Sequence, residues 1–153
     1  MWPFSQPEDA FRSAVRQEFG ALANECGSSL RQIEPLIFGF VTDHAVLTVG
    51  AYPGHFIGIC VKLRRRIGGE KLSVDDASDI GLAVVEEFAS GSRSDIYTKR
   101  QLWAGDQIRE EVEGLASAVR RFGLTFVSTP NGDWDGLRAF VQQKIDAPYR
   151  AKW

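Results

Sequence analysis

Two charged clusters of opposite sign are the residues of this sequence whose types and spacing could do chemistry. The first is basic and consists of Lys62, Arg64, Arg65 and Arg66. The second is acidic and consists of Asp75, Asp76, Asp79, Glu86 and Glu87. A basic cluster can bind phosphate groups or RNA, and an acidic cluster can speed association with a basic partner. The sequence therefore predicts two candidate binding surfaces.

Signatures of common enzymes are absent from the sequence, which has no dinucleotide-binding glycine fingerprint, Walker loop, nucleophile elbow or zinc-protease motif. The two histidines, His44 and His55, lie at predicted turns at opposite ends of a sheet, so they are poorly placed to share a metal or a proton. The two cysteines, Cys26 and Cys60, fit small buried hydrophobic residues better than metal ligands. We therefore expect no catalytic residue, no metal and no cofactor.

Three short apolar runs predict the strands that would carry the basic cluster. They cover residues 36–41, 45–52 and 56–63, and each is rich in β-branched or aromatic side chains. The short breaks between them are typical of hairpin turns, so the runs form an antiparallel meander. In the third run Ile57, Ile59, Val61 and Leu63 alternate with other residue types, which predicts one buried face.

Helices are predicted before and after this meander in the sequence, and they pack mostly on one face of the sheet. Residues 5–26 begin with a capping box and place Phe11, Val15 and Phe19 on one stripe, until Gly27 caps the end. Residues 73–88 predict a helix whose outward half carries the acidic cluster without a lysine or arginine. Residues 106–122 predict a third helix, and Asp133 starts a last one with Trp134, Leu137, Val141 and Ile145 on one side. Residues 96–103 fit either a fourth strand or the approach to the third helix.

This order predicts one α+β domain over residues 1–153, with a single antiparallel meander of three or four strands packed against helices. With 153 residues and 44% hydrophobic content, the chain can bury one core. The net charge of -2 argues against a general nucleic-acid coat or an electrostatic membrane binder. No run approaches membrane-spanning length and the start lacks a signal-peptide pattern, which favours a soluble cytoplasmic protein.

The outline of the chain resembles that of small bacterial immunity proteins, which neutralise secreted toxin domains. The resemblance lies in an amphipathic helix, the meander at residues 41–49 and 55–63, an acidic helix and a C-terminal helix pair. It covers most of the chain as an order of elements and includes no diagnostic motif. It implies tight binding to a toxin domain, often a basic nuclease, without catalysis.

Three functions follow in order of preference. The first is a non-enzymatic protein-binding domain whose acidic cluster meets a basic protein partner. The alternative is a nucleic-acid or other anion-binding domain that uses residues 62–66, and the third is an unrecognised small enzyme. Each cluster also has a structural interpretation, in which the carboxylates are a solvated helix face and the basic residues pair with the acidic helix that follows.

Overall fold

The structure, a computed structural model, describes residues 5–52, 58–68, 72, 76–92 and 105–150, with the side chains of residues 7–146 within these ranges. Its elements follow the order α1 (Ser5–Glu25), β1 (Arg31–Glu34), β2 (Ile37–Val41), β3 (Ala45–Tyr52), β4 (Gly58–Arg65), β5 (Ile80–Gly81), α2 (Leu82–Ser90), α3 (Gly105–Ala118), the π-helix η2 (Val119–Gly123), α4 (Leu124–Ser128) and α5 (Trp134–Arg150). The α+β class is confirmed.

The described strands form one antiparallel sheet in the order β1-β2-β3-β4-β5. The expected meander of three or four strands is therefore corrected to five, because short β1 and β5 extend it at its two edges. The sequence of β1 is mostly polar, so backbone pairing at an edge forms this strand where the side-chain pattern gives no signal. The proposed strand at residues 96–103 lies outside the described residues.

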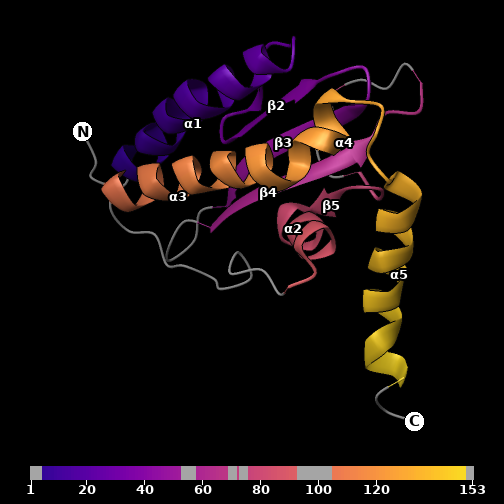
Figure 1. Cartoon of the computed structure of the whole chain (residues 1–153). Coiled ribbons are helices and arrows are strands. Elements are labelled where there is room, and N and C mark those ends of the chain that lie inside the picture. Colours follow the sequence, from indigo (N-terminus) through magenta and orange to yellow (C-terminus); the bar gives the residue numbers. More distant parts are fainter. Residues whose placement is uncertain (1–4, 53–57, 69–71, 73–75, 93–104, 151–153) are drawn as a thin grey trace.

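One face of the sheet carries the hydrophobic core. Phe40 pairs with Leu47, and Leu47 pairs with Leu63, so their side chains lie on the same face. Helix α1 and the continuous helix formed by α3, η2 and α4 cover this face (Figure 1). Gly27 ends the turn after α1 with φ +73°, as its C-cap role predicts.

The helix expected at residues 106–122 continues to residue 128, because Gly123 lies inside a π-helical turn and does not end it. A Cβ atom on Gly123 would lie 3.6 Å from Leu63 Cδ2, so this residue is packed directly against β4. The wider π turn is thus located where the helix crosses the sheet.

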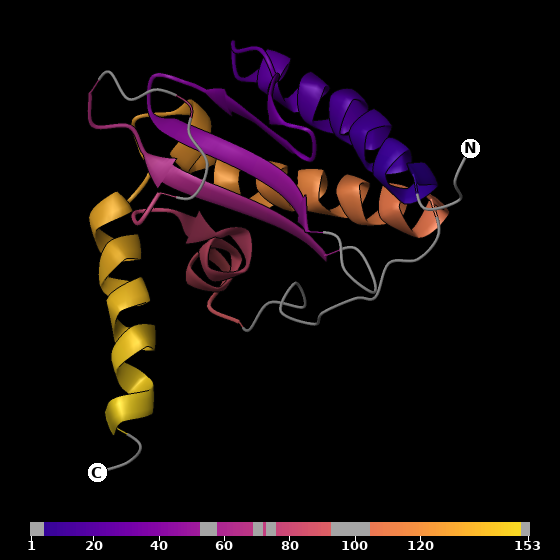
Figure 2. The ribbon, with the colours of Figure 1, turned by 180° about the vertical axis from the view of Figure 1, so that it is seen from behind.

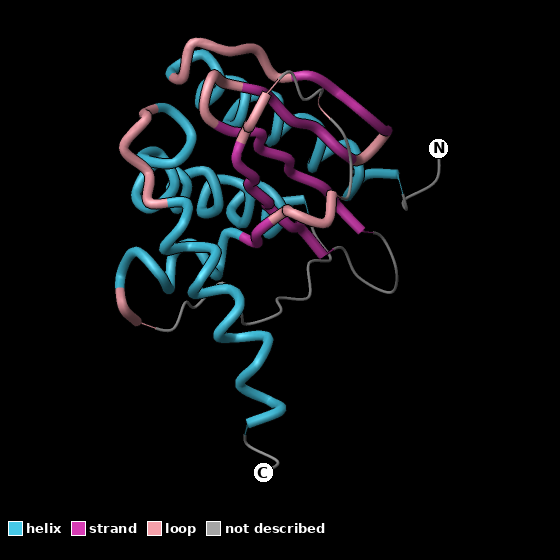
Figure 3. The backbone as a smooth tube through the Cα atoms, turned by 90° about the vertical axis from the view of Figure 1, so that its right-hand side faces the viewer, coloured by secondary structure: helices cyan, strands magenta, loops and turns pink. Residues whose placement is uncertain are grey.

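The second face of the sheet is covered by Leu72 at Gly39. A Cβ atom on Gly39 would lie 2.6 Å from the backbone oxygen of Leu47 and 2.8 Å from Leu72 Cδ1, and the fixed backbone contact is what requires glycine here. Arg64 points to this face and is 2% exposed. Figure 3 shows the strands on one side of the molecule, the helices behind them, and α5 extending away from both.

The helix predicted at residues 73–88 is wrong at residues 76–81, since α2 begins only at Leu82, and residues 73–75 lie outside the described residues. Residues 76–79 form a turn in which Ser78 N donates to Asp76 Oδ1 at 2.9 Å and Asp79 N donates to Asp76 O at 3.0 Å. Ile80 and Gly81 then pair with β4. Local aspartate hydrogen bonds and strand pairing therefore replace the first helical turns.

Helix α5 packs against the rest of the molecule through one side. The rings of Phe140 and Phe88 lie 5.6 Å apart, and Lys144 Nζ lies 2.7 Å from Glu87 Oε1. At its start, the Trp134 ring lies 5.0 Å from that of Phe126. Beyond these contacts the helix extends away from the sheet (Figures 1 and 2).

Candidate functional site: a groove beside helix α5

The acidic cluster does not form one outward helix face. Asp79 is the clearest correction, because its carboxylate accepts a hydrogen bond from Arg64 Nη1 at 3.0 Å and both side chains are buried, at 6% and 3% exposure. The cation that the acidic segment lacks in its own sequence thus comes from β4. Of the two interpretations of the basic residues, pairing with the following acidic segment is confirmed for Arg64.

Asp76 lies at the surface, 4.0 Å from Arg64 Nε, with its side chain 43% exposed. Its Oδ1 accepts hydrogen bonds from Ser78 Oγ at 2.6 Å and from Ser78 N at 2.9 Å. These bonds, with a smaller contribution from Arg64, hold the pKa of the Asp76 carboxyl below its usual value. Asp76 is therefore a fixed negative charge at neutral pH.

The remaining members of the acidic cluster differ in their surroundings. Glu87 pairs with Lys144 of α5 and is 18% exposed, so a second distant cation compensates the cluster. Glu86 is half-buried on α2. Asp75 lies outside the described residues. The role of these carboxylates in partner binding stays a prediction.

The basic cluster is divided among different environments. Lys62 lies 6.0 Å from the Tyr52 ring centroid, and Arg64 is buried with Asp79. Arg66 donates to the carbonyls of Thr42 and Gly68, each at 3.0 Å. Arg65 points to a different side of β4, where it lies 3.7 Å from Asp135 of α5. The four residues thus do not line one continuous surface.

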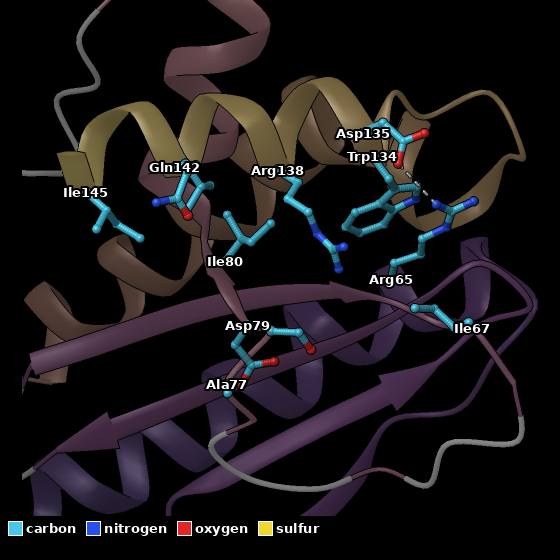
Figure 4. A pocket seen from close by; sticks show the side chains of 12 residues that line it. Arg65, Ile67, Ala77, Asp79, Ile80, Trp134, Asp135, Arg138, Gln142 and Ile145 are labelled. Atoms are coloured by element: carbon cyan, nitrogen blue, oxygen red, sulfur yellow. Dashed lines mark ion pairs between the residues drawn. The ribbon is translucent and has the colours of Figure 1, made fainter. Parts of the chain in front are cut away.

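A groove between α5 and the β4–β5 region brings together members of both clusters. We call it the α5 groove, and it has a volume of about 470 Å³. One wall is α5, and the other is formed by the end of β4, the turn before β5 and β5 itself (Figure 4). Its lining residues are Arg65, Ile67, Ala77, Ser78, Asp79, Ile80, Trp134, Asp135, Arg138, Val141, Gln142 and Ile145.

Apolar side chains are unusually exposed in the α5 groove. Ile67 is 74% exposed and Ile145 is 55% exposed, and together with Tyr52 they are the large apolar side chains that lie exposed among the described residues. Trp134, Val141 and Ile80 are half-buried between them. Exposed apolar side chains that gather around a groove are typical of a binding surface.

The charged groups of the groove are Arg65, Arg138, Asp79 and Asp135. Arg65 pairs with Asp135, and Asp79 is engaged by Arg64 behind the groove wall. Arg138 extends from α5 into the space between Ile80 and Trp134 (Figure 4). No residue that the structure describes forms an ion pair or hydrogen bond with Arg138.

Sequence reasoning missed Arg138 and Ile67, although α5 carried a signal for the first. The sequence pattern placed Trp134, Leu137, Val141 and Ile145 on one side of this helix. The structure buries Leu137 completely and leaves the other three residues in the groove. The spacing of Trp134, Arg138, Val141 and Ile145 is four, three and four residues, which marks a second stripe beside the one that contacts α2.

The α5 groove offers apolar contacts and the guanidinium of Arg138, which has no ionic partner among the described residues. Its described lining contains no histidine or cysteine that could act as general base or nucleophile. Elsewhere in the described part of the chain, no group of three or more histidine, cysteine, aspartate or glutamate side chains could hold a metal ion. His44 is half-buried at its turn, and His55 lies outside the described residues.

Comparison of the chain with known protein families, with curated proteins and with solved structures finds no match. The resemblance to immunity proteins therefore stays a prediction. Among the described residues, no helix combines the length and the apolar composition that crossing a membrane requires.

Proposed function

We propose that the protein is a non-enzymatic protein-binding domain and that the α5 groove is where its partner binds. The observation that carries the proposal is the exposure of Ile67 and Ile145 on facing walls of a groove of about 470 Å³. Covering these side chains removes apolar surface from water, which contributes about 25 cal/mol per Å² before the costs of association. A polypeptide segment with an apolar stripe would supply the missing cover.

The orientation of α5 supports this proposal. Leu137, Phe140 and Lys144 hold one side of the helix against the body, which leaves the Trp134 to Ile145 stripe accessible along about three helical turns. A partner helix laid along such a stripe buries its own apolar face, which is a recurrent way to recognise peptides and proteins.

An immunity-type role is the specific form of this proposal that the outline of the chain implies. The partner would then be a toxin domain. The carboxylates at the rim of the groove support contacts with a basic region of such a partner, because Asp135 is 95% exposed and Asp76 is 43% exposed. The genes beside this one are the direct check on this role: a toxin-like reading frame whose product binds the chain supports it.

Nucleic-acid or other anion binding by Lys62, Arg64, Arg65 and Arg66 has less support, because Arg64 is buried in an ion pair and Arg66 is engaged by backbone carbonyls. We expect weak RNA binding that falls steeply with salt. Sub-micromolar RNA binding at physiological salt, lost in Arg65→Glu, would place this alternative first. An unrecognised small enzyme has the least support, since the described lining of the groove contains no histidine or cysteine and Asp79 is held in an ion pair with Arg64.

A peptide-display selection tests the proposed function with synthetic ligands in place of the natural partner. A library of helical peptides is selected on the intact protein, and each binder is then measured against Ile145→Asp and Gln143→Asp. Both variants place the same charge on exposed positions of α5, but only Ile145 lines the groove. We expect binders that lose affinity about ten-fold or more in Ile145→Asp and keep it in Gln143→Asp. A selection without such binders contradicts the proposal.

A further inference from the structure

One cation that lines the α5 groove, the exposed Arg138, has no counter-ion among the described residues. Arg65 and Asp135 pair at 3.7 Å, and Asp79 is bound by Arg64 at 3.0 Å behind the wall. Arg138 alone among the four charged lining residues has no ionic partner within the described part of the chain. The groove is thus complementary to an anionic group from outside.

The position of Arg138 restricts what that anionic group can be attached to. Trp134 precedes Arg138 by four residues and Val141 follows it by three, and both line the groove. Figure 4 shows the guanidinium between Trp134 and Ile80, with Ile145 further along the same wall. An anion that reaches Arg138 therefore belongs to a segment whose neighbouring side chains contact these apolar residues.

We propose that the partner segment bound in the α5 groove is an acidic amphipathic helix whose Asp or Glu side chain pairs with Arg138. The proposal rests on the proposed function and names the chemistry of the partner at that same site. A guanidinium donates two parallel N–H···O bonds to a carboxylate, so the pair fixes both the position and the rotation of the bound helix. The stripe from Trp134 to Ile145 is about 17 Å long, which matches three turns of an apolar helix face.

This charge is opposite to the one that the acidic cluster predicts for the groove occupant. A basic helix would place a like charge beside Arg138 while its apolar face excludes water, and like charges repel more strongly when water is excluded. The acidic residues nearest the groove each have a cation close by, because Asp79 pairs with Arg64, Asp135 pairs with Arg65, and Asp76 lies 4.0 Å from Arg64 Nε. A basic surface of the partner would lie outside the groove.

Parallel display selections on three proteins test the charge of the occupant. One library of helical peptides is selected on the wild type, on Arg138→Glu and on Arg31→Glu. Arg31 is an exposed arginine of β1 outside the groove, so its variant makes the same change in net charge at another place. Groove binders are those that lose affinity in Ile145→Asp but not in Gln143→Asp. Thermal melts confirm that each variant is folded, and Arg138→Gln replaces Arg138→Glu if the latter unfolds.

We expect groove binders from the wild type and from Arg31→Glu to be enriched in Asp and Glu, and those from Arg138→Glu to favour Lys and Arg. In one synthetic wild-type binder, replacing its key Glu by Gln should weaken binding about ten-fold, which corresponds to 1.4 kcal/mol. Groove binders without an acidic preference overturn this inference and leave the proposed function standing. The absence of groove binders overturns both.

A second copy of this chain is the other occupant that the experiment separates. Sedimentation velocity over a range of concentrations precedes the selections, and we expect a monomer. A dimer that dissociates in Ile145→Asp but persists in Gln143→Asp would place a second copy in the groove and overturn the acidic-helix partner.

Discussion

At the scale of single residues, the pair formed by Arg64 and Asp79 joins the two charged clusters of the sequence. Taking two charges out of water is costly, and their attraction repays that cost only when the hydrogen-bond geometry is good. Here Arg64 Nη1 lies 3.0 Å from Asp79 Oδ1, and Asp76 adds a second carboxylate at 4.0 Å from Arg64 Nε. The pair attaches the turn before β5 to the sheet and so positions one wall of the α5 groove.

Removing one member of this pair should destabilise the fold. In Asp79→Asn the buried Arg64 loses its main counter-ion, and we expect the free energy of unfolding to fall by about 3 kcal/mol. The matched variant is Arg65→Gln, which breaks the exposed pair with Asp135 and should cost less than about 1 kcal/mol. Urea denaturation measures both. Equal effects in the two variants would show that burial of the Arg64 pair has no energetic consequence.

The pKa of Asp76 gives a residue-scale test that is independent of stability. Its lowered pKa arises first from the hydrogen bond of Ser78 Oγ, then from Ser78 N, and less from Arg64. Ser78→Ala removes the first of these donors, so the Asp76 pKa should rise. Because the folded-state pKa lies below the unfolded one, the stabilisation is present above the unfolded pKa and is lost as pH falls through the folded pKa.

Carboxyl carbon NMR titration of the wild type and of Ser78→Ala measures this shift. The pKa of Glu25, which the hydrogen bond from Arg120 holds below its usual value, should be the same in both proteins and serves as an internal control. An Asp76 pKa that does not change would remove the Ser78 hydroxyl as its cause.

At the scale of elements, local sequence patterns predict a helix or strand correctly where its residues alone determine its structure. The expected helix at residues 5–26 matches α1, and the three apolar runs match β2, β3 and β4 closely. The start of α2 was wrong because residues 73–79 carry both helix signals and turn signals. A partner fifteen residues earlier in the chain, Arg64, favours the turn. An interaction between residues this far apart in the sequence cannot be predicted from a short stretch of sequence.

Leu63 tests whether β4 forms the centre of the core, as its alternation predicts. Leu63 is fully buried, whereas the expected neighbour Ile59 is half-buried and Ile57 lies outside the described residues. Leu63→Ala should lower the free energy of unfolding by about 2–5 kcal/mol, depending on how far the site collapses. Ile67→Ala deletes similar atoms at a position 74% exposed, and it should change stability by about 0.5 kcal/mol or less.

Denaturant unfolding of both variants at one temperature provides the comparison. A small loss in Leu63→Ala would mean that the packing between β4 and the π-helical turn is not part of the stabilising core. A large loss in Ile67→Ala would contradict the open groove wall instead.

At the scale of the whole molecule, the candidate site depends on where α5 lies, and the sequence contains little information about that. The apolar stripe of α5 was visible, but Leu137 and Val141 looked equivalent on it. Only the contacts of Phe140 with Phe88 and of Lys144 with Glu87 decide which residues face the body. That Arg138 has no ionic partner among the residues the structure describes likewise depends on three-dimensional neighbours that no spacing rule predicts.

Hydrogen exchange across the whole chain should show that α5 is the least stable of the long helices. Its described anchors to the body lie along one side, so opening it exposes few buried side chains, whereas opening β3 disrupts pairs on both of its edges. We expect the amides of residues 138–146 to exchange with much less protection than those of β3.

A peptide bound in the α5 groove should then protect residues 138–146 and the turn at residues 76–80 together, because these segments form its two walls. Mass spectrometry of the free and peptide-bound protein measures both effects, with Ile145→Asp as the control that should gain no protection. Protection of α5 without the 76–80 turn would mean that the peptide contacts the helix from another side and that the two walls do not act as one site.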